Sequence, residues 1–178
     1  LNNELYNGEV DIFIESERDY IEKPQMRAGD IADRVIKSLD SEQVDFYVIN
    51  LANADILSHS GSFEATIKGV EAVDEAIGKL AEAILKKDGI MVITADHGNA
   101  ESLLYQFSGD KETKHNENPI PFYLMGKEFQ RSRTAKEVNK NMSQVNGLLA
   151  DVAPTILELM SIEKPAEMTG DSLLRLLV

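Results

Sequence analysis

The sequence contains only three histidines, and two of them lie close to an aspartate along the chain. His59 follows Asp55 by four residues, His97 directly follows Asp96, and His115 lies in a polar segment further on. Carboxylate oxygens combined with imidazole nitrogens suit manganese, zinc or iron better than calcium. Five such ligands are too many for one catalytic metal that keeps an open position. They favour two adjacent metals, an arrangement that serves phosphoryl and related transfers.

Each of these groups also has a purely structural interpretation. Asp55 and His59 could form a local hydrogen bond or a cap, Asp96 and His97 could form a turn, and any single histidine could be a solvated loop residue. These interpretations are weaker when taken together, because the predicted helices and the rest of the surface contain no histidine.

Two runs of strand-forming residues come directly before these groups. The run VDFYVINL (44–51) is rich in β-branched and aromatic residues and ends just before the first pair. The run IMVITA (90–95) predicts a strand buried on both faces, as in a parallel sheet. A helix between the two strands would complete a βαβ unit. Ligands of open α/β sheets bind beyond the carboxyl ends of the strands, so we expect the five residues in loops at that edge.

The helix between these strands has the clearest signal in the sequence, SFEATIKGVEAVDEAIGKLAEAILKKDG. Its large apolar residues recur every three or four positions and predict one apolar stripe. They are Phe63, Ile67, Val70, Val73, Ile77, Leu80 and Ile84. Ser62 is the expected N-cap, and Gly89 follows the expected end.

Three further elements are predicted with shorter signals. The segment AGDIADRVIKSLD predicts a helix behind Asp30 as a candidate cap. Residues 119–126, PIPFYLMG, predict a strand with its prolines confined to the start. The segment DVAPTILELMS predicts a helix with Asp151 as cap and Pro154 in the first turn. Residues 127–146 are polar and predict no element.

Composition narrows the range of partners. The chain has 178 residues, 43% of them hydrophobic, which is enough for one domain with a sizeable core. A net charge of −13 disfavours nucleic acid and anionic membranes as partners. The chain contains no cysteine, and no apolar run approaches the roughly 20 residues that span a bilayer. The first residues have no targeting pattern, and we expect the chain to be a piece of a longer polypeptide.

The sequence offers no clear nucleophile. Ser58, Ser60 and Ser62 lie near His59, but no serine has the surroundings of a hydrolase nucleophile elbow. A glycine-rich phosphate loop with the spacing of a P-loop is also absent from the sequence.

Four motifs, in order, resemble the C-terminal part of cofactor-independent phosphoglycerate mutase, a family of the alkaline-phosphatase-like superfamily. They are LANADILSHSGSFEATIKGVEAVDEAIGKL, MVITADHGNAE, KHNENPIPFYL and LLADVAPTILELMSIEKPAEMTGDSLL. The resemblance implies an α/β fold, part of a three-layer sandwich with a mostly parallel sheet and helices on both faces. It also implies a cytoplasmic glycolytic enzyme with two manganese ions that interconverts 3- and 2-phosphoglycerate through a phosphoserine.

The family's ligands are carried over residue by residue. Asp55, His59 and His115 match the ligands of one metal, and Asp96 and His97 match two ligands of the other. The motif departs from the family only at Ala54, where proline is usual, and at Ser58, where glycine is usual, and neither position is a ligand.

The family's remaining catalytic residues have no counterpart in these 178 residues. The nucleophilic serine, a further aspartate ligand and the substrate-binding arginines are expected upstream, together with the substrate domain. We therefore expect this chain to be the C-terminal portion of the phosphatase-like domain, with its own N-terminal half as a partner. Alone, it is expected to bind one metal well and the second poorly, and to catalyse nothing. Two alternatives remain: another phosphatase, sulfatase or phosphodiesterase of the superfamily, and a non-catalytic acidic domain.

Overall fold

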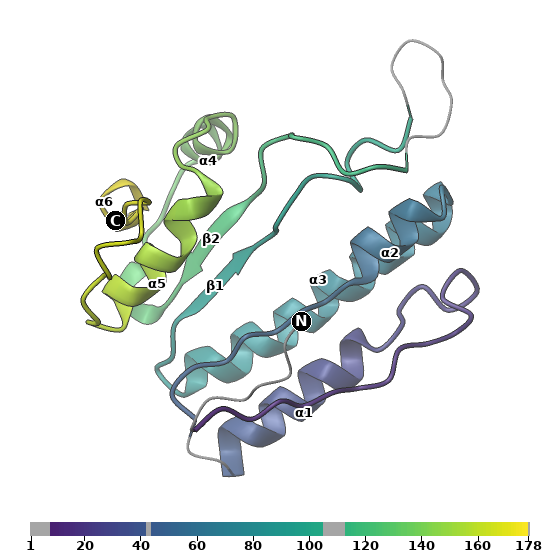
Figure 1. The fold of residues 1–178 in the computed structure, drawn as a ribbon, viewed down its shortest axis with the longest axis horizontal. Coiled ribbons are helices and arrows are strands. Elements are labelled where there is room, and N and C mark those ends of the chain that lie inside the picture. Colours follow the sequence, from purple (N-terminus) through teal and green to yellow (C-terminus); the bar gives the residue numbers. More distant parts are fainter. Residues whose placement is uncertain (1–7, 42–43, 105–112, 178) are drawn as a thin grey trace. The chain divides into compact units, whose positions relative to one another are not determined.

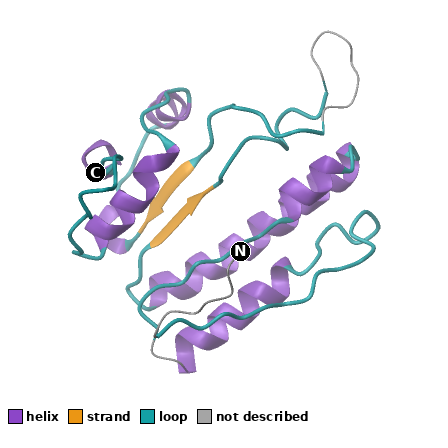
Figure 2. Ribbon diagram, viewed as in Figure 1, coloured by secondary structure: helices purple, strands orange, loops and turns teal. Residues whose placement is uncertain are grey.

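The computed structural model describes residues 8–41, 44–104 and 113–177. Over these residues the elements, in chain order, are α1 (Ala28–Ser41), α2 (Asn53–His59), α3 (Phe63–Lys86), β1 (Met91–Thr94), β2 (Phe122–Met125), η1 (Lys127–Phe129), α4 (Ala135–Met142), η2 (Leu149–Asp151), α5 (Val152–Leu159) and α6 (Leu174–Leu177) (Figures 1 and 2). None of the helices in this part of the chain is both long and apolar enough to cross a bilayer.

The chain divides into two compact units. The first contains Leu1–Leu80 and Ser102–Thr113, and so includes α1, α2 and most of α3. The second contains Ala81–Glu101 and Lys114–Val178, and so includes both strands and the C-terminal helices.

In the first unit, α2 comes close to α3 at Gly69. Leu57 of α2 is fully buried, and its Cδ1 lies only 2.2 Å from where a Cβ on Gly69 of α3 would stand. The side-chain amide of Asn53 donates to the carbonyls of Pro24 and Gln25, both at 2.9 Å, and so fixes the start of α2 on a preceding turn. The short helix is therefore held by tertiary contacts rather than by its own length.

Substitution of Gly69 by alanine is expected to destabilise the chain, although alanine is the better helix former. The gain in helix propensity is about 1 kcal/mol, whereas overpacking against the buried Leu57 costs about 1–3 kcal/mol. Gly78 of the same helix provides the matched control, because a Cβ added there would meet nothing within 4 Å. Gly78→Ala should stabilise by up to about 1 kcal/mol in urea unfolding. Equal effects of the two substitutions would contradict the close contact between α2 and α3.

The apolar stripe predicted on α3 is only partly buried. Leu80 is buried, but Phe63, Ile67 and Val70 are 65%, 44% and 44% exposed. The side of the helix that is buried in their place has small residues, among them Ala65, Thr66, Gly69 and Ala76. Small side chains allow a neighbouring helix to approach closely, so α2 packs on that side.

The predicted helix after residue 27 is confirmed as α1, but Asp30 is not its cap. The helix begins at Ala28, and Asp30 lies in the first turn, where its carboxylate is 3.0 Å from the guanidinium of Arg27. The buried Ser38 shares a 3.0 Å hydrogen bond with the hydroxyl of Tyr47. This bond ties α1 to the segment that leads into α2.

The predicted strand over residues 44–51 is wrong for this structure. Residues 44–51 form no strand, and Val44, Phe46 and Val48 are 41%, 48% and 84% exposed. A strand needs a neighbour to satisfy its backbone groups, and this segment has no ladder partner within the described ranges. The predicted βαβ unit is therefore not formed here.

The second unit contains a two-stranded antiparallel sheet. β1 and β2 confirm the strands predicted in 90–95 and 119–126, and their register pairs Met91 with Met125 and Thr94 with Phe122. The prediction that 90–95 is buried on both faces of a parallel sheet is wrong, because β1 is half-buried and its strand partner among the described residues is antiparallel. Mixed sheets often have an antiparallel edge strand, so this pair is compatible with an α/β domain.

The helix predicted from DVAPTILELMS is confirmed as α5, with Pro154 in its first turn, but Asp151 does not cap it as predicted, and the short α6 follows it. The carboxylate of Asp151 accepts instead from the backbone N–H groups of Leu148 and Asp171, at 2.8 and 2.9 Å, and these bonds hold its pKa below the usual value. The polar stretch 127–146 also contains α4, which begins with a capping box between Thr134 and Glu137.

Candidate metal centre

Helix α2 places Asp55 and His59 on one face. Residues four apart lie side by side on a helix, and here the Nε2 atom of His59 is 3.2 Å from Oδ1 of Asp55. The expectation that these residues lie in a loop is wrong, since both belong to α2. The helix makes their separation depend on backbone geometry rather than on loop conformation.

The backbone of the same unit orients the His59 ring. Nδ1 of His59 lies 2.6 Å from the carbonyl oxygen of Thr113. A carbonyl only accepts hydrogen bonds, so Nδ1 must carry the proton, and Nε2 is the nitrogen that faces Asp55. An Nδ1–H bond to a backbone carbonyl is the usual outer contact of a metal-binding histidine.

The Asp55–His59 pair fits a bound cation. Two electron-pair donors that face each other at 3.2 Å repel unless a proton or a metal ion lies between them. Metal–ligand bonds of about 2.1 Å at tetrahedral or octahedral angles place neighbouring donor atoms about 3.0–3.4 Å apart. The observed separation lies within that range, and the donors are the oxygen and nitrogen types that manganese, zinc and iron accept.

The second group of candidate ligands lies beyond the strand pair. His97 follows the end of β1, and its Nε2 is 3.5 Å from Oδ1 of the exposed Asp96. Gly98 and Asn116 form an antiparallel bridge, with a 2.9 Å bond from the Asn116 N–H to the Gly98 carbonyl. His97 and His115, each the residue before a bridge partner, lie diagonally across this antiparallel bridge.

The rings of His97 and His115 are stacked. Their centroids are 3.5 Å apart and their planes differ by 16°. In such a stack, each imidazole ring can still bind a separate metal ion through one of its nitrogens. The stack brings the two histidines of the second unit into direct contact.

A hydrogen-bond network that the sequence did not predict joins the two loops that bear these histidines. Glu101 accepts from the Asn99 backbone N–H and from the Asn118 side-chain amide, both at 2.8 Å. Partial burial alone would raise the pKa of Glu101, but hydrogen bonds from the Asn118 side chain and from the backbone outweigh it and lower the pKa. Nothing in the residue types predicted this network, because it depends on the bridge between the two loops.

The five candidate ligands thus fall into two groups, one in each compact unit. Asp55 and His59 are paired in the first unit, and Asp96, His97 and His115 are gathered in the second.

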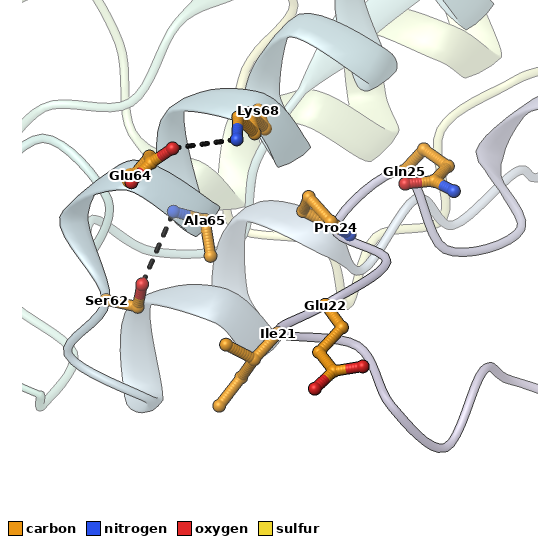
Figure 3. Close-up of a pocket in the computed structure, with 8 residues that line it drawn as sticks. All are labelled: Ile21, Glu22, Pro24, Gln25, Ser62, Glu64, Ala65 and Lys68. Carbon is orange, nitrogen blue, oxygen red and sulfur yellow. Dashed lines mark hydrogen bonds and ion pairs between the residues drawn. The ribbon is translucent and has the colours of Figure 1, made fainter.

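The serines near His59 have structural roles. Ser58 is fully buried and donates to the Ala54 carbonyl, and Ser60 donates to the Leu57 carbonyl. Ser62 accepts from the Ala65 N–H at 3.4 Å, which confirms it as the N-cap of α3 (Figure 3). Each of the three serines therefore supports the backbone of α2 or the start of α3.

An open pocket of about 700 Å³ in the first unit is separate from these ligands. Its lining combines the turn before α1 with the first turns of α3: Ile21, Glu22, Pro24, Gln25, Ser62, Glu64, Ala65 and Lys68 (Figure 3). The ammonium of Lys68 is 2.8 Å from the Glu64 carboxylate, and this hydrogen bond lowers the pKa of Glu64. With its lysine paired and a second glutamate beside it, the pocket is not suited to a phosphate group.

Comparison with known proteins shows the superfamily to which the chain belongs. Residues 2–164 match the metalloenzyme superfamily, and the chain belongs to that superfamily.

Similar proteins from two bacteria are both phosphoglycerate mutases. The chain is 42% identical, over 96% of its length, to the 2,3-bisphosphoglycerate-independent phosphoglycerate mutase of Pseudomonas entomophila, and 43% identical, over 85%, to that of Clostridioides difficile. It spans 32% and 28% of these two relatives, about a third of their length. The resemblance seen in the four sequence motifs is thereby confirmed.

A solved structure gives the same result for the fold. A crystal structure of Leishmania mexicana phosphoglycerate mutase, determined at low cobalt concentration, matches with a TM-score of 0.73 and 29% identity. The match covers 89% of this chain and 30% of the other. The predicted fold class, a partial α/β domain of alkaline-phosphatase-like type, is confirmed.

Proposed function

We propose that this chain is the C-terminal, metal-binding portion of a phosphoglycerate mutase that interconverts 3- and 2-phosphoglycerate through a phosphoserine. The observation that carries the proposal is the Asp55–His59 pair, whose facing donor atoms at 3.2 Å suit a shared cation. The mutase identity of the relatives supplies the substrate class.

The proposed centre has two divalent ions, with manganese as the first choice. Asp55, His59 and His115 would hold one ion, and Asp96 and His97 would supply two ligands of the other. Such ions, when bound, act as Lewis acids and neutralise charge on a phosphoryl group in transfer. The stacked contact of His97 with His115 brings one candidate ligand of each ion together, as two adjacent ions require.

The charge of the chain supports the proposal that another part of a longer polypeptide binds the substrate. The chain has 31 acidic and 18 basic residues, and Lys114 is the only basic sequence neighbour of the five ligands. A doubly charged phosphate is bound best by clustered arginines, which these positions lack. We therefore place the serine nucleophile, the substrate-binding cations and the substrate domain in the remaining part of a cytoplasmic mutase.

The test compares the whole gene product with the 178-residue chain. The whole protein is expected to convert 3-phosphoglycerate in a manganese-dependent manner and to hydrolyse aryl phosphates poorly. The 178-residue chain is expected to bind manganese, one ion more tightly than the other, without turnover.

Each alternative has its own outcome. Preferential hydrolysis of aryl phosphates by the whole protein would favour another phosphatase of the superfamily. Turnover by the purified 178-residue chain would refute the placement of the nucleophile. No manganese binding in calorimetry would favour a non-catalytic acidic domain.

A further inference from the structure

A single carboxylate connects the two loops that bear His97 and His115. One oxygen of Glu101 accepts from the backbone N–H of Asn99, in the loop after β1, at 2.8 Å. The other accepts from the side-chain amide of Asn118, in the loop before β2, at 2.8 Å. Each loop thus has one bond to the same side chain, a few residues from its histidine.

The space around this carboxylate is closely filled. A Cβ on Gly98 would stand 2.1 Å from Oδ1 of Asn116 and 2.7 Å from Oε1 of Glu101. Oδ1 of Asn116 also accepts from the Asn118 N–H at 3.0 Å, which folds the second loop back on itself. A side chain at position 98 would therefore displace the Glu101 carboxylate or the Asn116 amide.

The hydrogen bonds of Glu101 distinguish its role from that of the candidate metal ligands. Both of its oxygens already accept from protein donors, and these donors are amides rather than imidazoles. An ionised carboxylate is an acceptor only, so it matches two N–H donors without competition. These features suit a residue that holds the loops in place and does not bind the metal directly.

We propose that Glu101 is a positioning residue that holds the loops of His97 and His115 so that the two rings are stacked before a metal binds. The role rests on the proposed metal centre. Outer contacts of this kind determine ring orientation in metal sites, and their loss typically lowers metal affinity about 10–100-fold. Without Glu101, the Gly98–Asn116 bridge would remain as a tie between the loops, with less restraint on each histidine.

The experiment replaces Glu101 by glutamine. The amide has nearly the same size, but its NH2 group faces one of two N–H donors, so one of the two bonds is lost. Glu117→Gln is the matched control, because Glu117 is an exposed glutamate next to Asn116 and its replacement removes the same charge. Two quantities are measured on the 178-residue chain: manganese affinity by calorimetry, and amide hydrogen exchange at Gly98 and Asn116 in metal-free protein.

Glu101→Gln is expected to weaken manganese binding about 10–100-fold and to accelerate exchange at both amides, while Glu117→Gln changes neither. Unchanged amide hydrogen exchange in Glu101→Gln would show that Glu101 does not hold the two loops together. Faster exchange with unchanged affinity overturns the positioning role and leaves the metal centre intact. No manganese binding by the unaltered chain overturns the metal centre, and the positioning role fails with it.

Discussion

Replacement of His59 by alanine is expected to weaken manganese binding at the tighter site by more than about 100-fold, since even an outer contact of a ligand is worth about 10–100-fold. The substitution removes the nitrogen that faces Asp55 at 3.2 Å and leaves a lone carboxylate on α2. Calorimetric titration of the 178-residue chain with manganese measures the effect directly.

A second variant separates metal binding from structure at the same position. In His59→Asn the side-chain NH2 can take the place of Nδ1–H and keep the bond to the Thr113 carbonyl, while the nitrogen toward Asp55 is lost. We expect this variant to fold like the unaltered chain and to bind manganese as weakly as His59→Ala. Glu71→Gln, an exposed acidic position on α3, should leave binding unchanged and so exclude a general effect of surface charge. Full affinity in His59→Asn would mean that the Asp55–His59 contact is only a local ion pair.

Local signals explain which elements were predictable. Helix α3 has 24 residues, a serine cap and a regular apolar period, all of which are visible in one stretch of sequence. Helix α2 was missed because its seven residues show no period, and it is held by bonds from Asn53 to Pro24 and Gln25, 29 and 28 positions away. The capping box of α4 was a visible signal that the polar composition of the region obscured.

The failed strand prediction at 44–51 has a different cause. Its residues have the right propensity, but a strand is stable only beside another strand, and the described residues supply none at this position. Two large apolar residues are exposed here, Val48 of this segment and Phe63 of α3. The chain spans about a third of the length of its relatives. Propensity predicted what the segment can form, and the available neighbours decided what it does form.

The five candidate ligands were selected from local signals in the sequence. Residue type and the ends of predicted elements were enough to select Asp55, His59, Asp96, His97 and His115. The stack of His97 on His115 was not predictable, because it depends on a bridge between Gly98 and Asn116, which are 18 positions apart. The same long-range bridge explains why Glu101 gave no signal in the sequence.

The second large effect is expected from Leu57, the residue of α2 that lies between the two ligands of that helix. Leu57→Ala should destabilise the chain by about 2–5 kcal/mol, because the side chain is fully buried and α2 has few other contacts to close the cavity. That is a large share of the roughly 5–15 kcal/mol available to a typical domain. Urea unfolding measures the loss, and Leu176→Ala, at a leucine that is 63% exposed, should cost no more than about 0.5 kcal/mol.

The Leu57 substitution also links packing to the metal site. A ligand that binds only the folded state stabilises it in proportion to its affinity, so manganese should raise the unfolding midpoint of the unaltered chain. In Leu57→Ala the increase should be smaller, because α2 is then held less firmly against α3 and no longer fixes the positions of Asp55 and His59. Leu57→Met, which keeps most of the volume, should restore both stability and the response to manganese, at a cost below about 1.5 kcal/mol. An unchanged manganese response in Leu57→Ala would show that the two ligands are positioned by something other than the packing of α2 against Gly69.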